Sequence, residues 1–317
     1  MRYLVTGCLG FIGSAFCRYV IRNILGSTII GVNRNSNQKH LKRLEEVLQN
    51  PRFTLVYRDL SKESMVDLLD KTDYVINFAA RTHVDYSIKD PYPFLNDNVI
   101  SVVNMLEAAK KSTTLKRFIQ ISTDEVYGQI LVGRYTEESP SKPKNFYSAS
   151  KSAADGFVLS YFNMFNLPIL ISRTENNYGI YQSIEKVIPT FVKNALENKP
   201  LPVYGDGKHI RCWLHVDDHV RGILHLLEYG EVGNIYHIAG EQELENIELA
   251  KRILKLLNKP EDLIQFIPDH DIRPGHDRRY ALDVSKLKAI GWEAKYNLDE
   301  GLKQTISWYK EHREWFF

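Results

Sequence analysis

The sequence predicts an α/β fold in which helices cover both faces of a parallel sheet. Short apolar runs of strand length alternate with helical segments through the first half of the 317 residues. The first of these runs leads into a glycine-rich turn that opens a helix. Such apolar runs are typical of parallel strands buried on both faces, and their alternation with helices indicates a doubly wound sheet.

The first strand is expected over residues 1–6 and leads into the spacing Gly7-x-x-Gly10-x-x-Gly13, before an amphipathic segment over about 14–25. Glycine permits a tight turn and close approach of the backbone to a ligand. A helix N-terminus offers free N–H groups and a positive dipole end to a pyrophosphate. Three glycines alone can simply form a turn, but between a strand and a helix they favour a dinucleotide site. The residues expected to bind there are Gly7, Gly10, Phe11, Ile12 and Gly13.

The second strand is expected over 27–32, and it ends at the position that binds the adenosine ribose in dinucleotide-binding sheets. An acid is expected at that point for NAD, and this chain has Asn33-Arg34 instead. Asn33 can still hydrogen-bond a ribose hydroxyl. Arg34 can pair with a 2′-phosphate or can be an ordinary solvated loop charge. The sequence therefore predicts NAD as the cofactor and does not exclude NADP.

Two later strands end in residues suited to cofactor contact. The strand over 53–57 is followed by Asp59-Leu60, where an acid can meet the adenine amino group. The strand over 73–78 is followed by Ala79-Ala80, small residues that let a cofactor lie against the backbone. The other elements expected in this half are a charged helix over 39–48, a helix over about 96–109, and strands over 117–121 and 167–172.

Reactive side chains follow the strand over 117–121 directly. Thr123 supplies a hydroxyl, and Asp124 and Glu125 supply two adjacent carboxylates. In an open α/β sheet, ligands bind just beyond the carboxyl ends of the strands. We therefore expect these three side chains to line the site.

Tyr147 and Lys151 stand four residues apart at what looks like a helix start, so they share one helix face. A phenol, with an ordinary pKa of about 10, acts as a base near neutrality only where its anion is stabilised. An ammonium one helical turn away can provide that stabilisation. We expect this pair to meet the carboxylates in one pocket.

The composition argues against several classes of function. The net charge is 41 − 39 = +2, without the basic field that indicates nucleic acid or a membrane surface as partner. Cys8, Cys17 and Cys212 are too few and too scattered for a disulfide framework or a zinc site, and the first two are expected to pack beside the glycine turn. No signal peptide precedes the first strand, and no apolar run approaches the ~18 residues of a spanning helix. We expect a soluble, cytoplasmic protein.

The histidines also argue against a metal site. His215, His219 and His225 are expected on a helical stretch and are not spaced with carboxylates as metal ligands are. We therefore expect no metal.

After residue 172 the regular alternation loosens, with proline and glycine clusters between shorter elements. We expect residues 1–172 to form a Rossmann-like NAD(P)-binding domain to which later segments return. Residues 173–317 are expected to form mainly a smaller α/β domain that binds the substrate.

These motifs resemble those of the extended short-chain dehydrogenase/reductase family. The resemblance rests on the glycine spacing, Asp59, Ser122-Thr123 and Tyr147-x-x-x-Lys151. More narrowly, the nucleotide-sugar 4,6-dehydratases, and within them the dTDP-glucose 4,6-dehydratases, have similar segments over essentially the whole chain. The Asp-Glu pair is the most discriminating element, since related epimerases and decarboxylases lack it after the Ser/Thr. The segments that carry this narrower resemblance are 122–128, 176–182 and 273–280.

The resemblance implies loss of water across C5–C6 of a hexose, for which C4 is first oxidised to a ketone so that the C5 proton becomes acidic. Tyr147 is implied to take the C4 hydroxyl proton as hydride passes to the nicotinamide, and Thr123 to hydrogen-bond the same oxygen. Glu125 is implied to take the C5 proton. Asp124, kept protonated by burial beside another carboxylate, would donate to the departing C6 hydroxyl. Hydride then returns to C6, so the cofactor is regenerated and stays bound.

The resemblance also implies residues that hold the nucleotide and diphosphate. Arginine suits a diphosphate because its fork of donors matches the phosphate oxygens. Taken singly, each of these residues could be an ordinary surface or core-edge residue. The implied set is His83, Asn177, Arg211, Arg273 and His276, and the other residues expected to bind the substrate are Thr123, Lys186 and Val187.

Some residues depart from the family pattern. Asn33 replaces the usual acid, Arg81 stands where many members carry Glu, and Tyr86 stands where they carry Arg. Thr174-Glu175 occupies the place of a small Cys-Ser pair. Because these changes line the predicted pocket, the substrate can be a nucleotide sugar other than dTDP-glucose.

Other functions stay open within and beyond this family. Within it, the chain could be another NDP-sugar 4,6- or 5,6-dehydratase, a 4-epimerase or a decarboxylase. A non-catalytic dinucleotide sensor is the alternative of a different class, but such proteins typically lose the Tyr/Lys pair that this chain keeps.

The resemblance implies a homodimer in which the helix near 100–110 and the helix from Lys151 pack into a four-helix bundle. The side chains that suit such an interface would equally suit a core. They are Ala149, Ala153, Ala154, Phe157 and Phe162.

Overall fold

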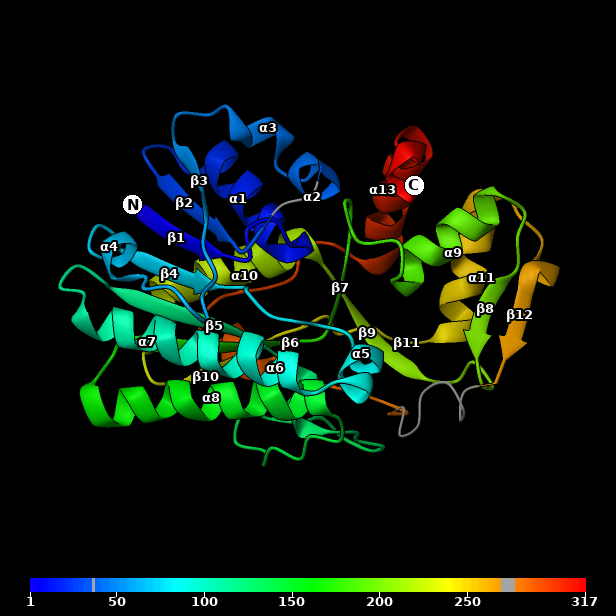
Figure 1. Ribbon diagram of the computed structural model, residues 1–317. Coiled ribbons are helices and arrows are strands. Elements are labelled where there is room, and N and C mark those ends of the chain that lie inside the picture. Colours follow the sequence, from blue (N-terminus) through cyan, green and yellow to red (C-terminus); the bar gives the residue numbers. More distant parts are fainter. Residues whose placement is uncertain (36–37, 269–276) are drawn as a thin grey trace.

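The larger of two lobes is built on one parallel sheet. The computed structural model describes residues 1–35, 38–268 and 277–317. In this lobe seven strands lie in the order β10-β6-β5-β4-β1-β2-β3 (Figure 1). The chain fills one side of β1 with β2 and β3 and then returns to its other side, which confirms the predicted doubly wound α/β sheet. The strands are β1 (Arg2–Thr6), β2 (Thr28–Asn33), β3 (Phe53–Tyr57), β4 (Tyr74–Asn77), β5 (Arg117–Thr123), β6 (Ile169–Thr174) and β10 (Ile235–Ile238).

Helices cover both faces of this sheet. α1 (Phe11–Asn23) and α10 (Val216–Tyr229) pack together on one face, and α7 (Ser101–Lys111) and α8 (Phe146–Phe165) pack together on the other (Figure 1). Each pair presents an apolar stripe to the strands, so the sheet is buried from both sides. The buried side chains include Phe16, Val20, Ile223 and Leu226 on the first face and Met105, Leu106, Ala154 and Val158 on the second.

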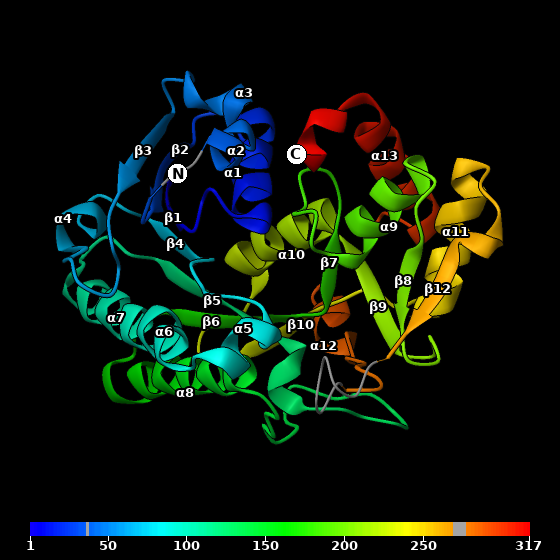
Figure 2. The same ribbon diagram turned by 45° about the vertical axis from the view of Figure 1, so that its right-hand side comes forward.

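The smaller lobe has its own core between three helices and two small sheets (Figure 2). One sheet has the order β11-β9-β7, and the other pairs β12 with β8 in parallel. Its elements are β7 (Asn176–Tyr178), α9 (Val187–Leu196), β8 (Leu201–Tyr204), β9 (Ile210–His215), β11 (Glu243–Glu245), α11 (Asn246–Leu257), β12 (Ile264–Ile267) and α13 (Leu298–Glu311).

Two expected helices differ from the structure. The helix expected over 39–48 is two short helices, α2 (Gln38–Lys42) and α3 (Glu45–Leu48). Between them Arg43 is buried and donates to Leu9 O (2.9 Å) and Tyr181 O (3.1 Å). The break between α2 and α3 thus coincides with a buried side chain that is held by backbone carbonyls of two other segments.

The helix expected over 96–109 begins with a π-helical turn, η1 (Asn96–Ile100), before α7. In this turn the Asn98 amide donates to Arg81 O (3.0 Å) and Ser150 Oγ (2.9 Å). π-turns inside helices occur frequently at functional sites. The remaining short elements are α4 (Val66–Leu69), α5 (Val84–Lys89), α6 (Tyr92–Leu95), η2 (Asp124–Tyr127), η3 (Glu261–Leu263), α12 (Ser285–Ala289) and η4 (Arg313–Phe316).

The end of the chain packs against the segment that leads into α9. The Tyr309 hydroxyl and the Trp315 indole both donate to Gln182 O, at 2.8 and 2.9 Å. Lys39 in α2 donates to Phe317 O (3.2 Å), so α2 also contacts this segment.

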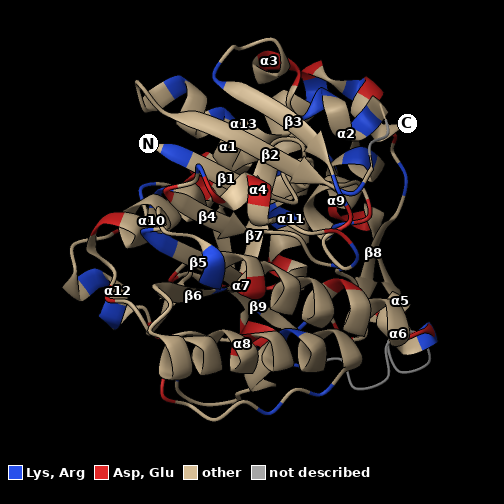
Figure 3. Ribbon diagram, turned by 60° about the vertical axis from the view of Figure 1, so that its left-hand side comes forward, with Lys and Arg blue, Asp and Glu red and all other residues tan. Residues whose placement is uncertain are grey.

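The cysteines and the surface charges were also predicted in outline. Cys8 and Cys17 are fully buried beside the glycine turn, as expected, and Cys212 is buried and free. Basic and acidic residues are interspersed over the helices (Figure 3). Within residues 1–35, 38–268 and 277–317, no helix combines the length and apolarity needed to cross a membrane.

Candidate active site

The glycine turn joins β1 to α1 and is compact enough to require glycine. Gly7 has φ +64°, and a Cβ on it would lie 2.8 Å from Ala79 N. A Cβ on Gly13 would lie 2.4 Å from Gly7 O. Gly10 is the N-cap of α1, and no side chain caps the free N–H groups there. This combination of a close turn and an open helix N-terminus fits a dinucleotide pyrophosphate.

Arg34 follows β2 directly and belongs to a cluster of alternating charges. Its guanidinium binds both carboxylate oxygens of Asp97, and its Nε lies 3.4 Å from Asp59 Oδ2. Arg81 Nε donates to Asp97 Oδ2 at 2.8 Å. Two guanidiniums thus meet two carboxylates. Arg34 is neither an isolated loop charge nor a guanidinium free to receive a phosphate.

Hydrogen bonds at the end of β5 hold the carboxylate pair in place. The Thr123 hydroxyl accepts from Glu125 N (3.3 Å), which caps the turn η2, and donates to Asp124 Oδ1 (3.0 Å). Asp124 is buried and Glu125 is half-buried. The Glu125 carboxylate accepts from Asn145 Nδ2 (3.3 Å), so the residue before α8 holds it.

The start of α8 brings the predicted Tyr/Lys pair to the same place. Asn145 and Ser148 form a reciprocal capping box that fixes the first turn. Tyr147 in that turn packs edge-on against Phe94, with ring centroids 6.4 Å apart. Lys151, one turn later, is buried and donates from Nζ to Ile121 O (2.6 Å). β5 and α8 therefore gather Thr123, Asp124, Glu125, Tyr147 and Lys151 at one point.

The electrostatics of this cluster favour uncharged groups. Burial, with the charge of Glu125, raises the pKa of Asp124 to about 7, and burial also raises the pKa of Glu125. Burial and both carboxylates raise the pKa of the Tyr147 phenol. Burial lowers the pKa of Lys151 to about 8. The expectation that Asp124 is held protonated by burial beside another carboxylate agrees with this direction.

The expected substrate residues come from both lobes. His83 is at the start of α5, and its Nε2 lies 3.4 Å from Oε1 of Glu185 in the smaller lobe. Lys186 and Val187 follow directly and begin α9. Arg211 in β9 donates to Asp277 O (2.8 Å), and its charge lowers the pKa of both Asp124 and Glu125. Arg273 and His276 lie outside the described residues.

Asn177 is placed differently from the other expected substrate residues. Its amide donates to Thr174 Oγ1 (3.1 Å) and Glu175 O (3.0 Å), and its Oδ1 meets Nδ1 of His219 (3.0 Å). All of its polar atoms are therefore engaged inside the protein.

The structure corrects the expected position of one histidine and adds Asn145 to the site. His215 is the last residue of β9 rather than part of a helix, while His219 and His225 lie on α10. Asn145 was not anticipated, although the spacing Asn145-x-x-Ser148 before Tyr147 is a capping signal. In the part of the chain that the structure describes, no group of three His, Cys, Asp or Glu side chains is placed to hold a metal.

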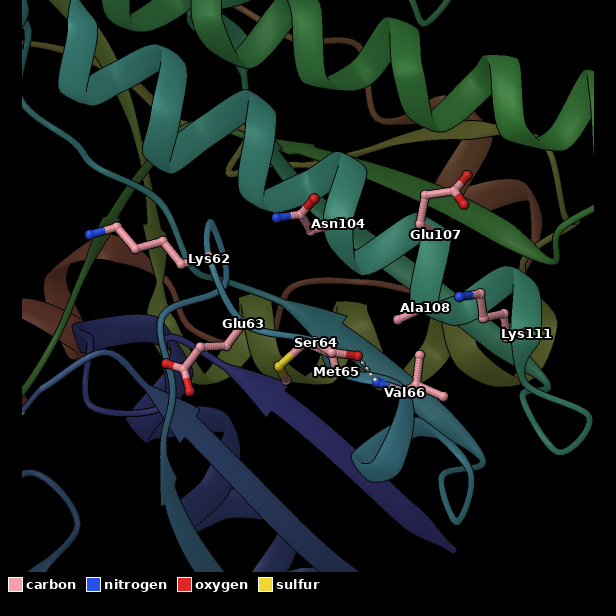
Figure 4. A pocket seen from close by; sticks show the side chains of 9 residues that line it. All are labelled: Lys62, Glu63, Ser64, Met65, Val66, Asn104, Glu107, Ala108 and Lys111. Atoms are coloured by element: carbon pink, nitrogen blue, oxygen red, sulfur yellow. Dashed lines mark hydrogen bonds between the residues drawn. The ribbon is translucent and has the colours of Figure 1, made fainter.

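A surface hollow beside α4 and α7 is separate from this cluster (Figure 4). None of the expected site residues lines it. Its lining residues are Lys62, Glu63, Ser64, Met65, Val66, Asn104, Glu107, Ala108 and Lys111.

The fold and the site together define an enzyme of the extended short-chain dehydrogenase/reductase class. A family model described as GDP-mannose 4,6 dehydratase matches residues 4–305. The chain belongs to this family.

Individual relatives agree along the whole length. A low-salt glycan biosynthesis protein of Haloferax volcanii is 41% identical over 310 residues, covering 98% of both chains. The dTDP-glucose 4,6-dehydratase of Haemophilus influenzae is 41% identical over 335 residues, again 98% of each. The crystal structure of dTDP-glucose 4,6-dehydratase from Streptomyces venezuelae with NAD and TYD bound has a TM-score of 0.92 at 38% identity, covering 100% of this chain and 99% of that one. UDP-glucuronic acid 4-epimerase from Bacillus cereus has the same TM-score at 27% identity, covering 98% and 99%.

Proposed function

We propose that this chain is an NAD-dependent nucleotide-sugar 4,6-dehydratase that converts dTDP-glucose to dTDP-4-keto-6-deoxyglucose. The observation that carries the proposal is the pair of carboxyl groups of Asp124 and Glu125, held at the end of β5 next to Tyr147. An epimerase needs no acid to expel a hydroxyl group, whereas a dehydratase needs both a base and an acid. The names of the H. influenzae and S. venezuelae relatives support dTDP-glucose as the substrate.

NAD, when bound, accepts hydride from C4 of the sugar and returns it to C6. The glycine turn fits its pyrophosphate, because its helix N-terminus has no competing side-chain cap. Asn33 and Asp59 are proposed to meet its adenosine end, and Tyr147 and Lys151 its nicotinamide end. The remaining residues proposed to hold it are Gly7, Gly10, Phe11, Ile12, Gly13, Arg34, Leu60, Ala79 and Ala80.

Tyr147 is proposed to take the C4 hydroxyl proton. Burial and two neighbouring carboxylates oppose ionisation of its phenol, so the proton transfer needs positive charge close by. Lys151 carries that charge on the same helix face, buried and anchored to Ile121 O. Thr123 would hydrogen-bond the same sugar oxygen.

Glu125 and Asp124 are proposed to remove water across C5–C6. Glu125 takes the C5 proton once C4 is a ketone, and its raised pKa makes it a stronger base than an exposed carboxylate. Asp124, with a pKa of about 7, is protonated in a substantial share of molecules near neutrality, and this form gives its proton to the C6 hydroxyl as the C6–O bond breaks. Two carboxyls in different environments thus divide the acid and base roles.

The smaller lobe is proposed to hold the nucleotide and the diphosphate. Lys186 and Val187 at the start of α9 and Arg211 in β9 would meet the anionic part of the substrate, with His83 opposite. We keep residues 1–172 as the cofactor domain, joined by β10, and residues 173–317 as mainly the substrate domain.

We further propose that the enzyme is a cytoplasmic homodimer. Three of the expected interface side chains, Ala149, Ala153 and Phe157, are exposed on α8, whereas Ala154 and Phe162 pack into the core. Further large apolar side chains on the same side of the lobe are exposed to solvent, which is typical of an unpartnered interface. They are Leu95, Ile100, Met164 and Phe165.

Water loss is the direct test of the function. Purified protein incubated with dTDP-glucose should give a product lighter by one water in mass spectrometry, and UDP-glucose, GDP-mannose and UDP-GlcNAc should not. Glu125→Gln should reduce the rate by a factor on the order of 10²–10⁴, because it removes the base. Glu138→Gln, which changes an exposed carboxylate nearby, is the control and should leave the rate unchanged. An unchanged mass with all four sugars would contradict the proposal.

Cofactor choice is predicted from the charge cluster around Arg34. A 2′-phosphate placed there would face the carboxylates of Asp59 and Asp97, so the wild-type protein should bind NAD more tightly than NADP. Asp97→Asn should raise the NADP affinity about tenfold, equivalent to about 1.4 kcal/mol, measured by calorimetric titration. Asp67→Asn, which removes an exposed carboxylate paired with Arg58, should not change it. Equal binding of NAD and NADP by the wild-type protein would overturn this explanation.

The dimer is tested through Phe157. Phe157→Glu places a charge in the proposed apolar interface and should give a monomer by light scattering at micromolar concentration. Tyr229→Glu changes an exposed aromatic residue on the opposite face of the sheet and should leave the dimer intact. A dimer in both variants would place the interface elsewhere.

A further inference from the structure

Glu175 is a buried carboxyl that the proposed reaction does not use. It follows β6 directly and replaces a small residue of the family pattern. β5 and β6 are parallel neighbours in which Thr123 pairs in register with Thr174. The next residues, Asp124 and Glu175, therefore leave adjacent strands side by side. Both are nearly inaccessible, at 5% and 4% exposure.

Among the described residues, each of these two carboxyl groups has one oxygen with a hydrogen bond and one buried oxygen without any. Glu175 Oε1 accepts from Leu282 N (2.9 Å), and Asp124 Oδ1 accepts from the Thr123 hydroxyl (3.0 Å). Glu175 Oε2 and Asp124 Oδ2 are buried and accept no hydrogen bond within the described residues. A buried ionised carboxylate needs both of its oxygens satisfied, so the two groups together favour a state that retains a proton.

The cations near Glu175 do not neutralise it. Arg134 and Arg279 influence it electrostatically, but both guanidiniums bind the carboxylate of Glu243, at 2.8 and 2.7 Å. The Cys212 thiol hydrogen-bonds the Glu175 carboxyl, which favours its ionised form, but the thiol itself carries no charge, since burial raises its pKa.

The groups that face Asp124 also disfavour its ionised form. Glu125 carries a like charge that raises the pKa of Asp124, and among the described residues Arg211 is a cation that lowers it. The Tyr147 and Tyr280 phenols keep their protons because burial raises both pKa values. Asp124 and Glu175 therefore oppose each other's ionisation, and burial together with the charge of Asp124 raises the pKa of Glu175.

We propose that Glu175 is a positioning residue that shares one proton with Asp124 and so keeps the acid of the reaction protonated. The inference rests on the proposed dehydratase function. Glu175 does not touch the substrate. Two carboxyls this close cannot both ionise readily, so their second ionisation is delayed to higher pH. When Asp124 gives the shared proton to the departing hydroxyl, water leaves and the C5 proton goes to Glu125. The proton that Tyr147 has taken from the C4 hydroxyl balances this loss, so the carboxyl pair can be reprotonated before the next turnover.

The test is the pH profile of water loss by Glu175→Gln. Gln keeps an acceptor for Leu282 N but carries neither the charge nor the exchangeable proton, so the pKa of Asp124 should fall. Since the reaction needs Asp124 protonated, activity is lost as pH rises through that pKa. The alkaline limb of the pH–rate profile should therefore move to lower pH by about one unit. At pH values above the limbs of both proteins, the variant should be about tenfold slower than the wild type. Glu175→Asp keeps a carboxyl and should largely restore the wild-type limb.

Glu137→Gln is the matched control. Like Glu175, Glu137 accepts a backbone N–H, that of His237 (3.0 Å), and burial raises its pKa, although Glu137 is half-buried and does not face Asp124. Its limb should coincide with that of the wild type, with thermal unfolding confirming that all variants fold. A limb that stays in place in Glu175→Gln would overturn the inference, whereas a wild-type protein that releases no water would overturn the proposed function instead.

Discussion

The parallel register of β4, β5 and β6 is the constraint on which the site depends. Because these strands run in one direction, their carboxyl ends meet at one edge, and side chains distant in sequence emerge together there. Asp124 and Glu175, which are distant in sequence, owe their proximity to that register. A slip of one residue would send the side chains of a strand to the opposite face, so the buried core on both faces also protects the geometry of the chemistry.

A buried ion pair connects this edge to the helix that carries the phenol. Asp155 on α8 accepts from Ser122 Oγ (2.9 Å) and from Arg173 Nε (3.0 Å), linking α8 to β5 and β6. Removing one partner of such a pair leaves an uncompensated buried charge, which is strongly destabilising. The pair therefore fixes where α8 lies on the sheet, and with it the position of Tyr147 and Lys151 beside the carboxyls.

The sequence predicts well those features that depend on neighbouring residues. The glycine turn, the strand ends and the spacing of Tyr147 and Lys151 follow from local rules. The state of Arg34 does not, because its partner Asp97 is 63 positions away. The burial of Arg43, which divides the helix expected over 39–48, depends on a carbonyl 138 positions away. Glu175 could be noticed as unusual, but its place next to Asp124 becomes visible only once the strands are paired.

The contacts of Arg43 and of the chain end have a consequence for how the molecule assembles. Arg43 joins the glycine turn to Tyr181 and Ser183, and that segment is in turn fastened by Tyr309 and Trp315. Contacts this distant in sequence form slowly, since long stretches of chain must first be closed into loops. The support of the glycine turn is therefore complete only once Tyr309 and Trp315 have been synthesised and have packed against Gln182. Assembly of the region around the turn is thus timed by a segment distant in sequence rather than by the strand and helix that form the turn.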